Sequence, residues 1–155
     1  MKLLLALSLF LGASSSHKIL VYNVKFGHSH SNYMGTLADT LSAAGHEVHS
    51  LIPELDPNLK DGTVNSTVIR IPQSPDVIPH FNRLMNNPDA NFFTIPVDSP
   101  LMPIIVGPVI SATFSTQCRA TLDHPGLLQR LKEEQYDVFI NENFDYCGLD
   151  EYFLG

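Results

Sequence analysis

The chain has 155 residues, of which 44% are hydrophobic and only 16% are charged. Nine Lys and Arg stand against sixteen Asp and Glu, so the formal net charge is −7 at pH 7. This acidic balance, without a basic cluster, argues against nucleic acid or an anionic membrane surface as a partner. The length is that of one domain that can bury a hydrophobic core.

The first 15 residues have the pattern of a secretory signal peptide. One basic residue, Lys2, precedes an apolar run at 3–11, and small residues follow at 12–15. That run is too short for a membrane-spanning helix, which needs about 20 apolar residues. We therefore expect residues 1–15 to be cleaved off as a signal peptide, which leaves a mature domain at 16–155 in the secretory pathway. Loss of Lys2 would change the charge to −8 (8 basic minus 16 acidic).

Two further features fit a secreted protein. The tripeptide Asn65-Ser66-Thr67 is an acceptor sequence for N-linked glycosylation, which predicts that Asn65 lies on the surface. Cys118 and Cys147 could pair in an oxidising compartment. Alternatively, both could be small buried hydrophobic residues with free thiols, and the sequence leaves both interpretations open.

The first predicted strand leads directly into a candidate site. Residues 19–24 are apolar and predict a buried strand, and a short loop containing His28 and His30 follows. A helix comes next, and an alternating segment at 46–52 predicts a second strand. Ligands bind beyond the carboxyl ends of strands in open α/β sheets, and histidine changes its charge near neutral pH. The loop is therefore the first candidate for chemistry.

The helix after this loop is predicted from apolar residues at spacings of three and four. Ser31 or Asn32 would cap its first turn, and Gly45 suits the left-handed conformation after its last turn. Asp39 would face away from the core. The predicted apolar stripe consists of Tyr33, Met34, Leu37, Ala38, Leu41 and Ala44.

The rest of the chain is less regular. β-branched residues predict a third strand at 63–71, and the segment YDVFIN predicts a last strand at 136–141. All eleven prolines fall within 53–125, so irregular connections are expected there. Helices are expected at 77–85 and at 111–130. Alternating strands and helices predict an α/β fold: a Rossmann-like parallel sheet with flanking helices.

Two carboxylates, Glu142 and Asp145, follow the last predicted strand. If this strand lies beside the first one in a parallel sheet, a carboxylate can accept the N–H of an imidazole and leave its other nitrogen basic. Such a histidine is a suitable general base for an alcohol or a phenol. From the residues alone, either His28 or His30 could be this base.

The same residues have simpler interpretations. Glu142 is also a typical solvated carboxylate at the end of a strand. His28 and His30 lack a Cys or a carboxylate at a familiar zinc spacing, so no metal is expected. The chain has no glycine-rich phosphate loop and no GxSxG motif. The remaining histidines are interpreted as structural or exposed, namely His17, His46, His49, His80 and His124.

Several segments together resemble the N-terminal half of UDP-glycosyltransferases of the glucuronosyltransferase type, particularly the nematode forms. They are the signal peptide, the strand and turn KILVYNVKFGHSH, the helix SNYMGTLADTLSAAGHEV and the late segment YDVFINENFDYCGL. The resemblance implies the GT-B architecture, in which the N-terminal half binds a lipophilic acceptor and a separate C-terminal half binds the UDP-sugar. It implies that 16–155 is part of the acceptor half.

The resemblance also implies roles for single residues. The general base of the family falls on His30, and its orienting aspartate falls on Glu142, which is one methylene longer; Asp145 is the alternative. His30 would take the proton of the acceptor hydroxyl while that oxygen displaces UDP with inversion. UDP-sugar is a co-substrate, and no cofactor is implied. Acceptor contacts are expected at three nearby side chains, Phe26, His28 and Tyr33.

The nucleotide-binding signature of the family has no counterpart in the chain. We therefore expect the donor half and the C-terminal membrane anchor to be absent, and the truncated chain to be inactive alone. A second hypothesis is a secreted, non-catalytic module that binds lipophiles or pairs with full-length relatives. Both hypotheses place the chain in the endoplasmic reticulum lumen or outside the cell. An uncovered sheet edge would favour association.

Overall fold

The structure is a computed structural model that describes residues 16–86, 96, 98–143, 145 and 147. The signal peptide expected at 1–15 lies outside the described residues. The described part contains a sheet of four parallel strands in the order β3-β2-β1-β4. The strands are β1 (Lys18–Tyr22), β2 (Glu47–Pro53), β3 (Thr67–Ile71) and β4 (Val138–Asn141).

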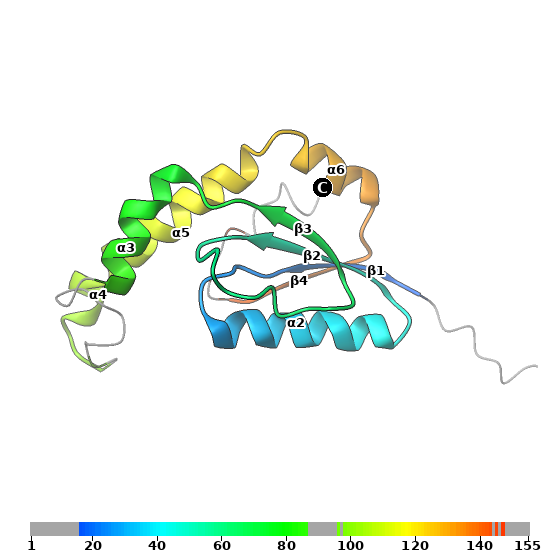
Figure 1. Ribbon diagram of the computed structural model, residues 1–155, viewed down its shortest axis with the longest axis horizontal. Coiled ribbons are helices and arrows are strands. Elements are labelled where there is room, and N and C mark those ends of the chain that lie inside the picture. The colour runs from blue at the N-terminus through cyan, green and yellow to red at the C-terminus, as the bar shows by residue number, and fades with distance from the viewer. Residues whose placement is uncertain (1–15, 87–95, 97, 144, 146, 148–155) are drawn as a thin grey trace, which may run out of the picture.

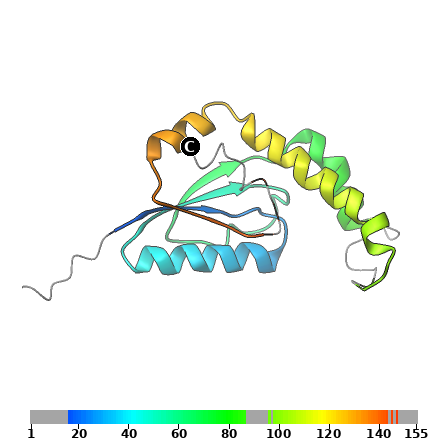
Figure 2. The ribbon, with the colours of Figure 1, turned by 180° about the vertical axis from the view of Figure 1, so that it is seen from behind.

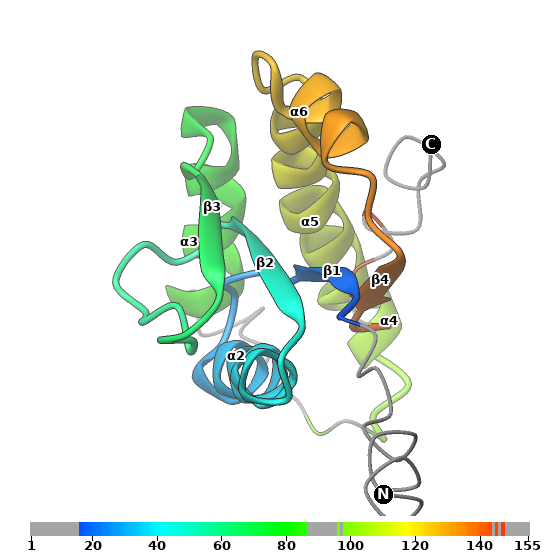
Figure 3. The same cartoon turned by 90° about the vertical axis from the view of Figure 1, so that its right-hand side faces the viewer.

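Helices lie on both faces of this sheet (Figure 1). An end-on view shows α2 on one face and α5 and α6 on the other (Figure 3). The predicted α/β fold, a Rossmann-like parallel sheet with flanking helices, is confirmed, and it is consistent with part of a GT-B fold. The helical elements are α2 (His28–Ala43), the 3-10 helix η1 (Pro75–Val77), α3 (Ile78–Asn86), α4 (Met102–Ile105), α5 (Gly107–Leu122) and α6 (Leu127–Glu134).

The two faces of the sheet are covered by different helices because successive strand residues point to opposite sides. Ile19 and Val21 of β1 pack against Met34 and Ala38 of α2. Full burial of an aliphatic side chain of this size stabilises the fold by about 1.5–3 kcal/mol. The cluster on the other face consists of Leu20, Tyr22, Leu51, Ile69, Ile71, Leu127, Leu131 and Cys147.

A helical arm made of η1, α3, α4 and α5 extends beyond the carboxyl ends of the strands (Figures 1 and 2). Its core joins the sheet through Phe26 and Leu55, which follow β1 and β2. The arm therefore forms a wall above the strand ends, where a site is expected in such a fold. The arm contributes Val77, Leu84, Val106, Val109 and Phe114 to this core.

Helix α2 begins earlier than predicted. Gly27 is its N-cap in an extended conformation, and the carbonyl of Gly27 accepts the N–H of Ser31 at 3.0 Å. Both candidate histidines therefore lie in the first helical turn, so their placement in a loop was wrong, as was the cap at Ser31 or Asn32. The left-handed conformation at Gly45 is confirmed, with φ +94°.

The apolar stripe of α2 is narrower than predicted. Tyr33 and Ala44 belong to the predicted stripe, but both are exposed, Tyr33 at 66%. Gly35 is buried instead, because the connection between β2 and β3 crosses the helix there. A Cβ on Gly35 would overlap the backbone of Gly62, so this contact requires glycine.

Two long predicted elements are shorter or divided. The strand predicted at 63–71 begins only at Thr67. The helix predicted at 111–130 is divided into α5 and α6, because Gly126 has φ +74° and cannot continue a helix. The helix predicted at 77–85 corresponds to η1 and α3, and the strands predicted at 46–52 and 136–141 are present with slightly shifted ends. In the described part of the chain, no helix is both long and apolar enough to cross a membrane.

Asp39 does not simply face away from the core. Its carboxylate accepts the hydroxyl of Thr63 and the backbone N–H groups of Val64 and Asn65 at 2.5–3.1 Å. Burial opposes ionisation of Asp39, but these hydrogen bonds outweigh it and lower the pKa of the carboxyl. Asp39 thereby fixes residues 63–66 as a loop against α2.

We predict that Asp39→Asn lowers the free energy of unfolding by about 1 kcal/mol, because fewer hydrogen bonds reach the loop. A lowered pKa in the folded state contributes stability above the unfolded pKa, near 3.8, and this stability is lost as the pH falls further. Urea unfolding between pH 6 and 2 should therefore show a weaker acid dependence in Asp39→Asn. An acid dependence identical to that of the unaltered protein would contradict the role of Asp39.

Candidate active site

The carboxyl ends of β1 and β4 lie side by side. The two strands pair in parallel, with Tyr22 opposite Asn141 in the register. The chain leaves β1 toward the first turn of α2, which carries His30, and it leaves β4 directly at Glu142. The first and last strands are thus neighbours, which is the condition under which a histidine and a carboxylate were expected to meet, and His30 and Glu142 are in contact although 112 residues separate them.

His30 and Glu142 are in direct contact. The distance between His30 Nδ1 and Glu142 Oε1 is 2.6 Å. Because a carboxylate can only accept, Nδ1 carries the proton of this bond and the lone pair of the neutral ring lies on Nε2. The side chains are 31% and 34% exposed, so solvent or a ligand can reach the pair.

The start of α2 leaves space for the imidazole. Gly27 precedes the helix, and a Cβ placed there would lie only 3.4 Å from His30 Cδ2. The ring of Phe26 lies on another side, with its centroid 6.1 Å from that of His30. The backbone of the turn between β1 and α2 and the Phe26 ring therefore both lie near the His30 ring.

A small pocket lies beside this pair, with a volume of about 10 Å³, roughly the space for one water molecule. Phe114 of α5 closes one side and packs on Phe26 with a centroid distance of 5.0 Å. Sequence reasoning missed Phe114, because a single aromatic residue in a distant helix forms no motif with the strand ends. The full lining is Tyr22, Val24, Phe26, His30, Phe114, Asn141, Glu142 and Asp145.

Asp145 lines the same pocket but bonds to other groups. Its carboxylate accepts the hydroxyl of Tyr22 at 3.2 Å and the backbone N–H of Cys147 at 2.9 Å. Burial raises the pKa of Asp145, and burial together with the nearby Asp145 charge raises the pKa of Tyr22 well above its usual value. Glu142 is the carboxylate that bonds to the His30 ring.

His28 and Tyr33 lie outside this pocket. His28 Nδ1 lies 3.1 Å from Asn32 Nδ2 on the exposed side of α2, and Tyr33 projects from the same helix into solvent. Of the three side chains expected to contact an acceptor, only Phe26 lines the pocket. The acceptor contacts expected at His28 and Tyr33 remain predictions.

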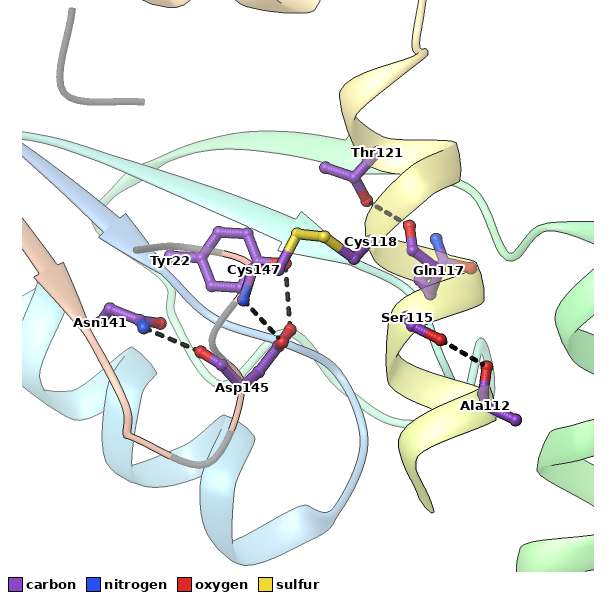
Figure 4. Close-up of a disulfide and its surroundings, with 9 residues drawn as sticks. All are labelled: Tyr22, Ala112, Ser115, Gln117, Cys118, Thr121, Asn141, Asp145 and Cys147. Carbon is purple, nitrogen blue, oxygen red and sulfur yellow. Dashed lines mark hydrogen bonds between the residues drawn. A yellow bond between two sulfur atoms is a disulfide. The ribbon is translucent and has the colours of Figure 1, made fainter. Parts of the chain in front are cut away.

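Cys118 and Cys147 form a disulfide, with their Cα atoms 5.5 Å apart. Of the two interpretations that the sequence left open, a disulfide or two buried free thiols, the structure has the disulfide. The bond connects α5 to the segment that follows β4, close to the pocket (Figure 4). Asn65, the predicted glycosylation site, is exposed in the loop before β3.

A separate group of potential metal ligands lies at the amino end of the sheet. It consists of Glu47, His49 and Glu134, whose ligand atoms all lie within 4.8 Å of one another. The ammonium of Lys18 lies 3.1 Å from Glu47 and also pairs with Glu134, so both carboxylates already have a cationic side chain as partner. His49, interpreted as structural, is buried and contacts the Tyr136 hydroxyl at 2.7 Å.

Sequence reasoning also missed a buried lysine near the strand ends. Lys25 is 3% exposed, and its ammonium lies 2.5 Å from Glu54 and 3.6 Å from Asp61. Asp61 also pairs with Arg70 of β3. These ion pairs hold the connection between β2 and β3 near the start of α2. No local motif marks them, because the partners come from three separate segments: the turn after β1, the connection between β2 and β3, and β3.

Nearly the whole chain aligns with nematode proteins. The candidate UDP-glucuronosyltransferase ugt-47 of Caenorhabditis elegans is 27% identical over 95% of this chain. The protein of the same name in Caenorhabditis briggsae is 28% identical over 94%, and ugt-48 of Caenorhabditis elegans is 27% identical over 88%. No protein-family model matches the chain, and no solved structure matches it.

These alignments cover 26–27% of each relative, so the chain spans about a quarter of the length of the curated relatives it matches. The relatives carry the same family name as the family inferred from the strand, turn and helix motifs. The comparisons therefore confirm the resemblance: over this quarter, the chain is similar to nematode proteins named as UDP-glucuronosyltransferases.

Proposed function

We propose that this chain contributes the acceptor side of an inverting UDP-glycosyltransferase, with His30 as the general base and Glu142 as its orienting carboxylate. The observation that carries the proposal is the 2.6 Å contact between His30 Nδ1 and Glu142 Oε1 at adjacent strand ends. The names of the relatives support a UDP-sugar as the donor.

The proposed reaction needs one base on this side. Nε2 of His30 takes the proton from the hydroxyl of a small lipophilic acceptor, and the acceptor oxygen attacks the anomeric carbon of the sugar. The bond from that carbon to UDP breaks, and UDP leaves with the electron pair, so the configuration inverts. Glu142 stabilises the imidazolium that forms and keeps its ring in place.

The pocket fits the reacting end of an acceptor. Its volume suits a hydroxyl group, while the rings of Phe26 and Phe114 offer apolar walls to the carbon atoms beside it. Acceptor contacts at His28 and Tyr33 belong to this proposal as well. Because the chain spans about a quarter of its relatives, binding of the UDP-sugar is proposed for the full-length protein.

The proposal places the protein in the secretory pathway. The disulfide between Cys118 and Cys147 supports an oxidising compartment, where such bonds persist. The exposed Asn65 is the proposed site of an N-linked glycan. A signal peptide at 1–15 would deliver the chain there.

Glu142→Gln tests the proposed pair. In the full-length protein, supplied with UDP-glucuronic acid or UDP-glucose and a phenolic acceptor, we expect kcat to fall by about 10–100-fold, because a neutral amide stabilises the imidazolium poorly. Release of UDP is the readout, and Glu142→Asp is the matched variant that retains the charge. Equal turnover in the unaltered protein and in Glu142→Gln would contradict the proposal.

A second candidate function is binding of a lipophile without catalysis, alone or with a full-length relative. The aromatic walls at Phe26 and Phe114 favour it, since they would hold an apolar ligand in the absence of a donor. It predicts that the purified 155-residue chain binds the phenolic acceptor but releases no UDP. Detectable UDP release that depends on Glu142 would exclude this alternative.

A further inference from the structure

The turn that carries Glu142 is closed by Asp145. The Asn141 side chain donates to the carbonyl of Asp145 at 2.9 Å, and the N–H of Asp145 points to the carbonyl of Glu142 at 3.4 Å. Glu142, the first residue after β4, therefore lies in a short turn that these two hydrogen bonds close. The direction in which the Glu142 side chain points toward His30 therefore depends on the position of Asp145.

Asp145 is held by two buried partners (Figure 4). Its carboxylate accepts the hydroxyl of Tyr22 at 3.2 Å and the N–H of Cys147 at 2.9 Å. Tyr22 is 1% exposed at the end of β1, and Cys147 is joined to Cys118 of α5. The turn is thus fixed to the central strand on one side and to α5 on the other.

The disulfide at Cys118 also holds the helix that carries Phe114, which lines the opposite side of the pocket. Phe114 and Cys118 are four residues apart in α5 and therefore lie on the same side of that helix. The disulfide at Cys118 consequently fixes both the turn with Glu142 and the helix that carries Phe114.

A buried carboxylate is costly, because it leaves water. Asp145 is 9% exposed, and its carboxylate accepts hydrogen bonds from two neutral donors, the Tyr22 hydroxyl and the Cys147 amide. Burial raises the pKa of Asp145, which shows that the site disfavours its charge. Asp145 also lines the pocket beside His30 and Glu142, and a carboxylate with a shifted pKa in such a place is a candidate for a functional role.

We propose that Asp145, held by Tyr22, is a positioning residue that fixes Glu142 against His30. The inference rests on the proposed function. Asp145 acts through the turn and through Glu142, so loss of its anchor should lower kcat more than it changes KM, since the apolar contacts of the acceptor remain.

A double-mutant cycle tests this inference in the full-length protein. Tyr22→Phe removes only the hydroxyl that anchors Asp145, and we expect kcat to fall by about tenfold with little change in KM. In the background Glu142→Ala there is no carboxylate left to position, so the same change should alter kcat by less than about twofold. If Tyr22→Phe does not fold, Asp145→Asn takes its place in the cycle.

Tyr136→Phe is the matched control. It removes a hydroxyl that contacts His49 at the amino end of the sheet, so it should leave kcat unchanged. A second readout does not require turnover. The Nδ1 proton of His30 should give a slowly exchanging NMR signal in the unaltered protein, and this signal should broaden in Tyr22→Phe and persist in Tyr136→Phe.

The outcomes distinguish failure of the positioning role of Asp145 from failure of the proposed function of His30 and Glu142. An equal fall in kcat for Tyr22→Phe with and without Glu142 would show a general structural effect and overturn the positioning role. An unchanged His30 signal in Tyr22→Phe would overturn it as well. If Glu142→Ala itself leaves turnover unaltered, the proposed function fails, and the positioning role fails with it.

Discussion

Replacing His30 by Ala in the full-length protein is expected to lower kcat by about 10²–10⁴-fold, the usual contribution of a general base. The acceptor hydroxyl would then have to lose its proton to water as its oxygen attacks the sugar. KM for the acceptor should change little, because the rings of Phe26 and Phe114 remain in place. The measurement is UDP release at saturating donor and varied acceptor.

His28→Ala is the matched control for this experiment. His28 lies two residues away in the same helical turn, but its ring lies near Asn32 and outside the pocket. Because His28 is proposed as an acceptor contact and not as the base, His28→Ala should change KM for the acceptor and leave kcat within about twofold of the unaltered protein. The assignment of the base would be wrong if His28→Ala removed turnover and His30→Ala retained it.

Gly62→Ala is expected to lower the free energy of unfolding by about 2–5 kcal/mol. Gly62 has φ +78°, a left-handed conformation that costs other residues about 1–2 kcal/mol. A Cβ at this position would also overlap the carbonyl of Ser31, and such overpacking adds about 1–3 kcal/mol. Urea unfolding followed by circular dichroism measures the change.

Substitutions at two other glycines separate the conformational cost from the cost of overpacking. Gly126 has a similar φ of +74° but nothing within 4 Å of a Cβ, so Gly126→Ala should show the conformational cost alone. Gly107 is helical with open space around it, so Gly107→Ala should be nearly neutral. A loss in Gly62→Ala no larger than that in Gly126→Ala would show that the connection does not press on α2 as described.

The residues alone were sufficient to predict the parallel sheet, whereas a contact between a histidine and a carboxylate was expected only if the first and last strands were neighbours. Apolar strand segments alternating with a well-spaced helix determine a parallel sheet, and strand ends then collect the polar residues that follow them. The choice of His30 over His28 came from the family resemblance. The structure agrees with that choice in one respect, because the ring of His30 and not that of His28 contacts Glu142.

The sequence was not sufficient for features that depend on distant contacts. The early start of α2 follows from the conformation of Gly27, and Gly35 replaces Tyr33 on the inner side because another segment crosses the helix there. Phe114 and the anchor at Tyr22 belong to the pocket only because the arm folds over the strand ends. Local periodicity contains no information about such crossings.

The position of β4 determines when the pocket can exist during synthesis. β1, β2 and β3 pair with one another within the first 71 residues, whereas β4 joins β1 only after residue 141 has been made. A nascent chain can therefore build three strands and α2 while His30 still lacks its carboxylate. The contact between His30 and Glu142 therefore forms late in folding. Any change that delays docking of β4 should leave the proposed base without its carboxylate in molecules that already contain α2. Circular dichroism would overlook this defect, and an activity measurement would reveal it.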